Sequence, residues 1–141
     1  MRDKAFLDTN VLIYLYTKDD ESKRNTVYGL LDDNSCAASV QVLNEVSNVM
    51  LKKFSLSSTQ IREHLDNIEL VCDEMLPVHR GTIDNALAIK DRYGFSYFDS
   101  LMLASALDGD CQIIFTEDMS DGQLINDTLR IVDPFKQELK Q

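Results

Sequence analysis

The sequence predicts an α/β fold built on a buried parallel sheet. Apolar strand-like segments alternate with amphipathic helices along the chain, and the strand segments lack the polar and apolar alternation of a half-exposed sheet. The chain has 141 residues, of which 44% are hydrophobic and 27% are charged. Such a composition is typical of one soluble globular domain. We therefore expect a single domain over residues 1–141.

The first half of the chain predicts one strand followed by three helices. Lys4–Leu7 is a short apolar strand, and the segment from Thr9 to about Tyr16 is typical of a helix. After a polar stretch, a second helix reaches about Leu31. Ser39 is able to cap a third helix, whose apolar residues recur at helical spacing. These residues are Val42, Leu43, Val46, Val49 and Met50.

The second half predicts three more helices and three strands. Serine residues at 57 and 96 are suited to begin helices, and glycines at 94 and 109 are suited to end them. The expected helices cover about residues 59–68, 81–93 and 96–108. Strands are expected within residues 70–78, 111–115 and 129–132, whereas the short apolar segment 36–38 is too short to assign alone.

Two aspartates closely follow predicted strands. Asp8 comes directly after Lys4–Leu7, and Asp118 is separated by two residues from the strand that ends at Phe115. Open parallel sheets bind ligands outside the carboxyl ends of their strands, so both side chains are expected at the same edge. Taken singly, either aspartate is better explained as a helix cap or a turn residue.

Two further carboxylates lie on apolar helix faces. Glu45 is three residues after Val42 and four before Val49, so it shares their side of the third helix. Asp99 lies within a nearly all-apolar helix, where an unpaired carboxylate costs several kcal/mol to bury. Alternatively, Glu45 reaches solvent from the edge of the apolar face, and Asp99 belongs to a capping box with Ser96.

Together the four carboxylates predict a metal site. Like charges held close repel one another, and they are tolerated around a cation. All-oxygen ligands without clustered histidine or cysteine favour Mg²⁺ or Mn²⁺ over zinc. Such an ion activates water and stabilises charge during phosphodiester hydrolysis. We therefore expect Asp8, Glu45, Asp99 and Asp118 to form the catalytic metal site of a nuclease.

The same segments resemble the PIN domain, and most closely its VapC-type ribonuclease toxins. The resemblance covers nearly the whole chain through four motifs, each of which contains one of the carboxylates. They are Phe6-Leu7-Asp8-Thr9-Asn10-Val11-Leu12, Ser39-Val40-Gln41-Val42-Leu43-Asn44-Glu45, Tyr97-Phe98-Asp99-Ser100-Leu101 and Phe115-Thr116-Glu117-Asp118-Met119. Their order and spacing make the set much more specific than any single motif.

The resemblance implies a three-layer α/β/α sandwich with a central parallel sheet of about five strands. It implies an endoribonuclease that uses Mg²⁺ or Mn²⁺, forms a homodimer and is inhibited by a VapB-type antitoxin. It also implies that Asn10 and Thr116 support the metal site through hydrogen bonds, and that Asp121 adds an outer carboxylate. The resemblance further implies an RNA substrate, often cut in single-stranded loops.

The net charge of the chain and two lysines on the predicted helix that carries Glu45 affect how it could bind a phosphate backbone. The net charge of −10 is awkward for a protein that binds phosphate backbones, although a local basic rim is compatible with an acidic body. Lys52 and Lys53 extend the face of Glu45 by two helical turns, where they would position a phosphate. Equally, lysines are favoured at a helix C-terminus by the helix dipole.

Three other functions compete with a nuclease. A haloacid-dehalogenase-like phosphatase needs a second aspartate two residues after Asp8, where this chain has Asn10. A response-regulator receiver domain needs paired acids at the first strand, whereas Leu7 precedes Asp8. A catalytically silent PIN-like module that binds a partner remains the main alternative. With no signal peptide and no apolar run of about 20 residues, we expect a cytoplasmic protein without a membrane segment.

Overall fold

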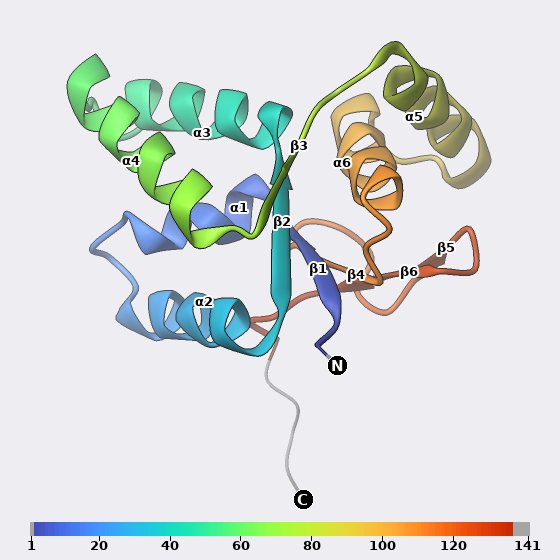
Figure 1. Ribbon diagram of the computed structural model, residues 1–141, viewed down its shortest axis with the longest axis horizontal. Helices are drawn as coiled ribbons and strands as arrows, with labels where there is room; N and C mark the ends of the chain where they lie inside the picture. The colour runs from blue at the N-terminus through green and yellow to red at the C-terminus, as the bar shows by residue number, and fades with distance from the viewer. Residues whose placement is uncertain (1, 137–141) are drawn as a thin grey trace, which may run out of the picture.

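The computed structural model describes residues 2–136 and shows a six-stranded sheet between two layers of helices (Figure 1). The strands lie in the order β3-β2-β1-β4-β6-β5, and all neighbours are parallel except β5 and β6. The strand bounds are β1 (Lys4–Leu7), β2 (Ser35–Ser39), β3 (Glu74–Leu76), β4 (Ile113–Phe115), β5 (Leu124–Ile125) and β6 (Leu129–Val132). The predicted α/β sandwich is confirmed.

The helices divide between the two faces of this sheet. In Figure 1, α1 to α4 lie on one side of the strands, and α5 and α6 lie on the other. Their bounds are α1 (Thr9–Leu12), α2 (Glu21–Asp33), α3 (Val40–Lys52), α4 (Ser58–Val71), α5 (Arg80–Tyr93) and α6 (Tyr97–Asp108). A 3₁₀ turn, Ile13–Leu15, extends α1, so the first predicted helix consists of a short α-helix followed by a 3₁₀ turn.

Capping residues set the helix ends as their chemistry predicts. The hydroxyl of Ser39 accepts the N–H of Val42, and Ser57 forms a full capping box with Gln60 at the start of α4. Gly94 ends α5 with a left-handed φ of 81°, a conformation that costs glycine little. These three ends are confirmed where the sequence places them.

Three elements differ from the sequence prediction. The segment 36–38 belongs to β2, a fully flanked strand that pairs with both β1 and β3. Helix α4 continues through Val71, so the strand expected from Leu70 begins only at Glu74. The antiparallel edge strand β5 was not predicted. It pairs with β6 across a turn in which Asn126 and Asp127 adopt positive φ, as these residue types tolerate.

The core fills both sides of the sheet. Phe6 and Leu7 of β1 and Ile114 of β4 are inaccessible to solvent. Met102 and Leu103 of α6 are also buried against this sheet. Nothing between residues 2 and 136 forms a helix with the length and hydropathy that a membrane span requires.

Candidate active site

The topology places the site between β1 and β4. The chain runs outward through β1, β2 and β3, and then returns to place β4 on the other side of β1. Such a reversal opens a crevice at the carboxyl ends of the two central strands, where open α/β sheets bind ligands. Asp8 follows β1, and Thr116, Glu117 and Asp118 follow β4.

Asp8 is the most buried of the four acids. Only 5% of its surface is exposed. Its Oδ1 accepts the N–H of Thr9 at 2.7 Å, and its Oδ2 accepts the hydroxyl of Thr116 at 2.8 Å. Burial raises the pKa of Asp8 to about 6, despite these two hydrogen bonds, and the charges of Glu45 and Asp99 raise it further. Asp8 therefore both caps α1 and presents a poorly compensated negative charge.

A small hydrogen-bond network joins Asp8 to Asp118. The hydroxyl of Thr116 donates to Asp8 and accepts from the side-chain amide of Asn10 at 3.3 Å. The same amide donates to Oδ2 of Asp118 at 2.9 Å, and Oδ1 of Asn10 accepts the N–H of Glu117 at 3.1 Å. Asn10 and Thr116 therefore hold the loop after β4 against the start of α1.

Glu45 reaches the site from α3, on the side of the helix that packs toward the core. Its residue is half-buried, while Val42 and Val46 on the same helix are fully buried. The hydroxyl of Thr9 donates to Oε1 of Glu45 at 3.1 Å, and Gln41 donates to Oε2 at 3.0 Å. These two bonds hold the carboxylate against Thr9, the residue that follows Asp8.

Asp99 approaches from the other helical layer, at the start of α6. The hydroxyl of Ser96 accepts the backbone N–H of Asp99 at 3.2 Å, so Ser96 caps the helix. The carboxylate of Asp99 lines the pocket, and burial together with the charge of Asp118 raises its pKa. Capping by Ser96 and a pocket-facing Asp99 therefore coexist.

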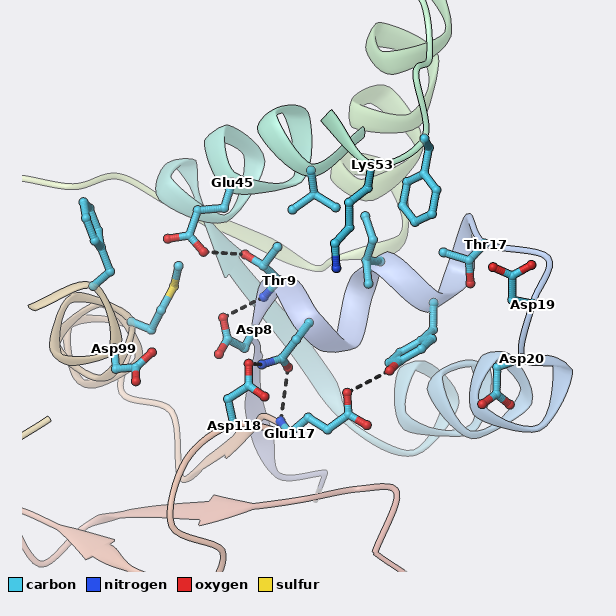
Figure 2. A pocket seen from close by; sticks show the side chains of 17 residues that line it. Asp8, Thr9, Thr17, Asp19, Asp20, Glu45, Lys53, Asp99, Glu117 and Asp118 are labelled. Atoms are coloured by element: carbon cyan, nitrogen blue, oxygen red, sulfur yellow. Dashed lines mark hydrogen bonds between the residues drawn. The ribbon is translucent and has the colours of Figure 1, made fainter. Parts of the chain in front are cut away.

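All four acids line one pocket of about 570 Å³. Figure 2 shows Asp8, Glu45, Asp99 and Asp118 around one end of it, while Asp19 and Asp20 lie at the opposite end. The structure thus brings together four side chains from the end of β1, α3, α6 and the segment after β4. The pocket is large enough for one nucleotide-sized ligand.

The donor chemistry of this pocket fits Mg²⁺ or Mn²⁺. Carboxylate oxygens are the ligands these ions prefer, and the buried charge of Asp8 lacks an ion-pair partner within residues 2–136. In the same residues, however, no three acidic, histidine or cysteine side chains already stand in an arrangement that could hold a metal ion. The acids share a pocket but are spread around it, as mutual repulsion favours.

Two predicted site residues lie elsewhere. Asp121 is exposed and does not line the pocket; its Oδ1 accepts the N–H of Asp133 at 2.8 Å, and its Oδ2 lies 3.6 Å from the amine of Lys136. Lys52 and Lys53 are both exposed, but Lys53 lines the pocket and Lys52 does not. A one-residue step along a helix turns the side chain by roughly 100°, which separates the two lysines.

Sequence reasoning missed two further residues of the pocket lining, Tyr14 and Glu117, and the lysine outside the lining that both of them contact. Glu117 pairs with the amine of Lys23 and accepts the phenol of Tyr14 at 2.8 Å. The amine of Lys23 also lies over the ring of Tyr14, 4.8 Å from its centroid. Lys23 is separated from Glu117 by 94 positions, so no local pattern indicates the pair. The sign of this pair in the sequence is limited to Glu117, an acidic residue inside the motif that contains Asp118.

Solved structures share this fold. A chain of a toxin–antitoxin complex from Klebsiella pneumoniae matches with a TM-score of 0.66 and 20% identity, covering 94% of this chain and 99% of that one. VapC20 of Mycobacterium tuberculosis, a sarcin–ricin-loop-cleaving toxin, matches with a TM-score of 0.63 and 18% identity, covering 81% and 89%. VapBC2 of Rickettsia felis, bound to promoter DNA, matches with a TM-score of 0.66 and 20% identity, covering 92% and 99%.

The sequence comparisons narrow the assignment to a family. No curated protein sequence matches the chain. The family model described as the PIN domain matches residues 5–120, which span β1 through the loop after β4 and include all four pocket acids. The chain therefore belongs to the PIN domain family.

Proposed function

We propose that this protein is a metal-dependent endoribonuclease that uses Mg²⁺ or Mn²⁺. PIN domains are typically nucleases. The observation that carries the proposal is the meeting of Asp8, Glu45, Asp99 and Asp118 in one pocket at the point where the sheet topology reverses. A buried carboxylate such as Asp8 is costly unless a cation or strong hydrogen bonds compensate it.

Each side chain has a distinct part in the proposed site. Asp8, Glu45, Asp99 and Asp118 would hold the ion, which when bound would lower the pKa of a water molecule and offset charge on the phosphodiester oxygens. Thr116 holds Asp8 by its hydroxyl, and Asn10 holds Asp118 by its amide. These neutral donors orient two ligands without adding charge, so they pre-position the site.

We further propose that the chain is the toxin of a VapBC-type pair. Three of its structural relatives are VapC-type toxins or chains of toxin–antitoxin complexes, and the match extends over nearly their full length. In this proposal the protein is a single domain that acts in the cytoplasm as a homodimer. A VapB-type antitoxin would inhibit it, and RNA would be its substrate.

The test is cleavage of a mixed-sequence RNA by the purified protein with Mg²⁺, with Mn²⁺ and with EDTA. Wild type should cleave only when a divalent ion is present, and Asp8→Asn and Asp99→Asn should each lose at least about 100-fold. Asp91→Asn is the matched control, because Asp91 is an exposed acid on α5 that does not line the pocket. It should cleave within about threefold of wild type, as exposed substitutions do little.

A thermal melt supplies a readout that is independent of activity. Mg²⁺ or Mn²⁺ at 100 times its dissociation constant should stabilise wild type and Asp91→Asn by about 3 kcal/mol. The same ion should stabilise Asp8→Asn much less. Cleavage that survives EDTA, or equal cleavage by Asp99→Asn and wild type, would refute the metal site. Wild type that binds a divalent ion but cuts no RNA would instead favour a catalytically silent partner-binding module.

A further inference from the structure

The pocket continues well beyond the four acids. Its other end lies between α1, the 3₁₀ turn and the C-terminal end of α3, and it is lined there by Tyr14, Thr17, Lys53 and Phe54. Figure 2 shows the side chain of Lys53 extending from α3 into the pocket, with Thr17 beyond it. This end contains a cation, an aromatic ring and a hydroxyl, and none of them is needed to hold a metal.

Lys53 is the single basic residue in the pocket lining as the structure describes it. No ion pair involving Lys53 occurs within residues 2–136. The acids around it are otherwise engaged or exposed: Glu117 pairs with Lys23, Asp20 accepts the N–H of Lys23 as the cap of α2, and Asp19 faces solvent. Lys53 therefore keeps its charge available for an anion inside the pocket.

The backbone that follows α3 presents Phe54 to the same end of the pocket. Its residue is 39% exposed although it is large and apolar. The helix ends through bonds from the N–H of Lys53 to Val49 O at 2.8 Å and from the N–H of Leu56 to Met50 O at 3.1 Å. Ser55 closes this turn at a φ of 52°, a left-handed conformation that non-glycine residues rarely adopt. The turn holds Phe54 next to Lys53.

Thr17 supplies an unused polar atom. Its Oγ1 is buried, and within the described residues it has no hydrogen-bond partner. The carbonyl oxygen of Thr17 accepts Nη1 of Arg24 at 2.7 Å, so its backbone is held in place. Because buried hydroxyls are normally paired, a rotation of this side chain that turns Oγ1 toward the pocket would let a bound ligand supply the missing partner.

We propose that Lys53, Phe54 and Thr17 form a nucleotide subsite next to the catalytic acids. The proposal rests on the ribonuclease function and adds a place for the nucleotide adjacent to the bond that is cut. The phosphate of that nucleotide would contact Lys53, its unstacked base would lie against Phe54, and a polar group would pair with Thr17. Phosphate contact and stacking would then anchor RNA to an acidic protein.

Binding of RNA without cleavage tests the subsite directly. The probe is a short fluorescein-labelled single-stranded RNA of randomised sequence, titrated by anisotropy against proteins that all carry Asp99→Asn. Phe54→Leu should bind at least about 5-fold more weakly, whereas Phe54→Trp should keep the affinity because it keeps an aromatic face. Thermal melts of each variant show whether it is folded.

The lysine pair provides a matched charge control. Lys53→Gln should weaken binding and reduce the slope of log affinity against log salt by about 0.7, as expected when one phosphate contact to a single strand is lost. Lys52→Gln removes the same charge from the neighbouring exposed position and should change neither quantity. Kinetically, Lys53→Gln should raise KM more than it lowers kcat.

The outcomes separate this subsite from the ribonuclease activity. Equal affinities for Lys53→Gln and Lys52→Gln, or for Phe54→Leu and Phe54→Trp, would overturn the subsite even if wild type cuts RNA. Such a result would indicate that this end of the pocket binds a protein partner instead of RNA. If wild type cuts no RNA but the variants differ in RNA binding as described, the subsite stands while the proposed activity fails.

Discussion

The side-chain amide of Asn10 donates a hydrogen bond of 2.9 Å to Oδ2 of Asp118, although 108 positions separate the two residues. Oδ1 of Asn10 also accepts the N–H of Glu117 at 3.1 Å. One amide thus fixes both the carboxylate and the backbone of the loop that follows β4. An aspartate at position 10 could accept but not donate, so the neutral amide is what allows Asp118 to approach α1.

Replacing Asn10 by alanine should misplace Asp118. Loss of these bonds should lower the free energy of unfolding by about 1–2 kcal/mol. Cleavage of RNA should fall by roughly 10-fold or more, because small displacements of a catalytic group are costly. Urea unfolding and cleavage rates measure the two effects.

Asn85→Ala is the control for this change. Asn85 is an exposed amide on α5, away from the acidic pocket. Its replacement should leave stability and cleavage close to those of wild type. A cleavage rate for Asn10→Ala equal to that of Asn85→Ala would show that Asp118 needs no support from Asn10.

The raised pKa of Asp8 predicts a pH-dependent cost to stability. The group has a pKa of about 6 in the fold, compared with 3.8 for an unperturbed aspartate. The folded protein therefore holds this proton more tightly than the unfolded chain does. Ionised Asp8 should destabilise the metal-free fold increasingly from about pH 4 to pH 6, and by a constant amount above that.

Asp8→Asn should remove this cost. Without metal at neutral pH, the variant should be more stable than wild type by up to about 3 kcal/mol, since each unit of pKa shift corresponds to about 1.4 kcal/mol. Below about pH 4 the difference should shrink, because Asp8 is then protonated in both states. Urea unfolding in EDTA at the two pH values, with Asp91→Asn as the control, measures the difference in stability. A variant that is less stable than wild type at neutral pH would contradict the prediction.

The ion pair between Lys23 and Glu117 should stabilise the pocket more than a surface pair does. The two side chains are 30% and 23% exposed, and Tyr14 bonds to both of them. A double-mutant cycle of Lys23→Met and Glu117→Gln should give a coupling free energy of about 1 kcal/mol or more. Unfolding of the four proteins in urea provides the cycle.

Arg80 and Asp84 form the comparison pair. They are four residues apart on α5, with side chains that are 85% and 57% exposed. Their cycle should give about 0.5 kcal/mol or less, as exposed helix pairs do. Equal couplings for the two pairs would show that Lys23 and Glu117 contribute no more than solvent-exposed charges.

Local sequence patterns predicted most of the secondary structure. Serines at positions 39, 57 and 96 and the glycine at 94 mark helix ends through bonds made within one turn, so a reader of the sequence can locate them. Strand β5 was missed because two residues show no periodicity, although the three polar residues Asn126, Asp127 and Thr128 between Ile125 and Leu129 are a turn signal.

The sequence by itself determined which residues could form an acidic site, because strand ends and helical spacing are short-range properties visible in Asp8, Glu45, Asp99 and Asp118. Only the tertiary structure decided what surrounds them. It places Lys53 but not Lys52 in the pocket lining and leaves Asp121 outside the pocket. It also forms the ion pair between Lys23 and Glu117. Those relations depend on how distant segments pack across the sheet, and contacts between distant segments leave no periodic trace in a single sequence.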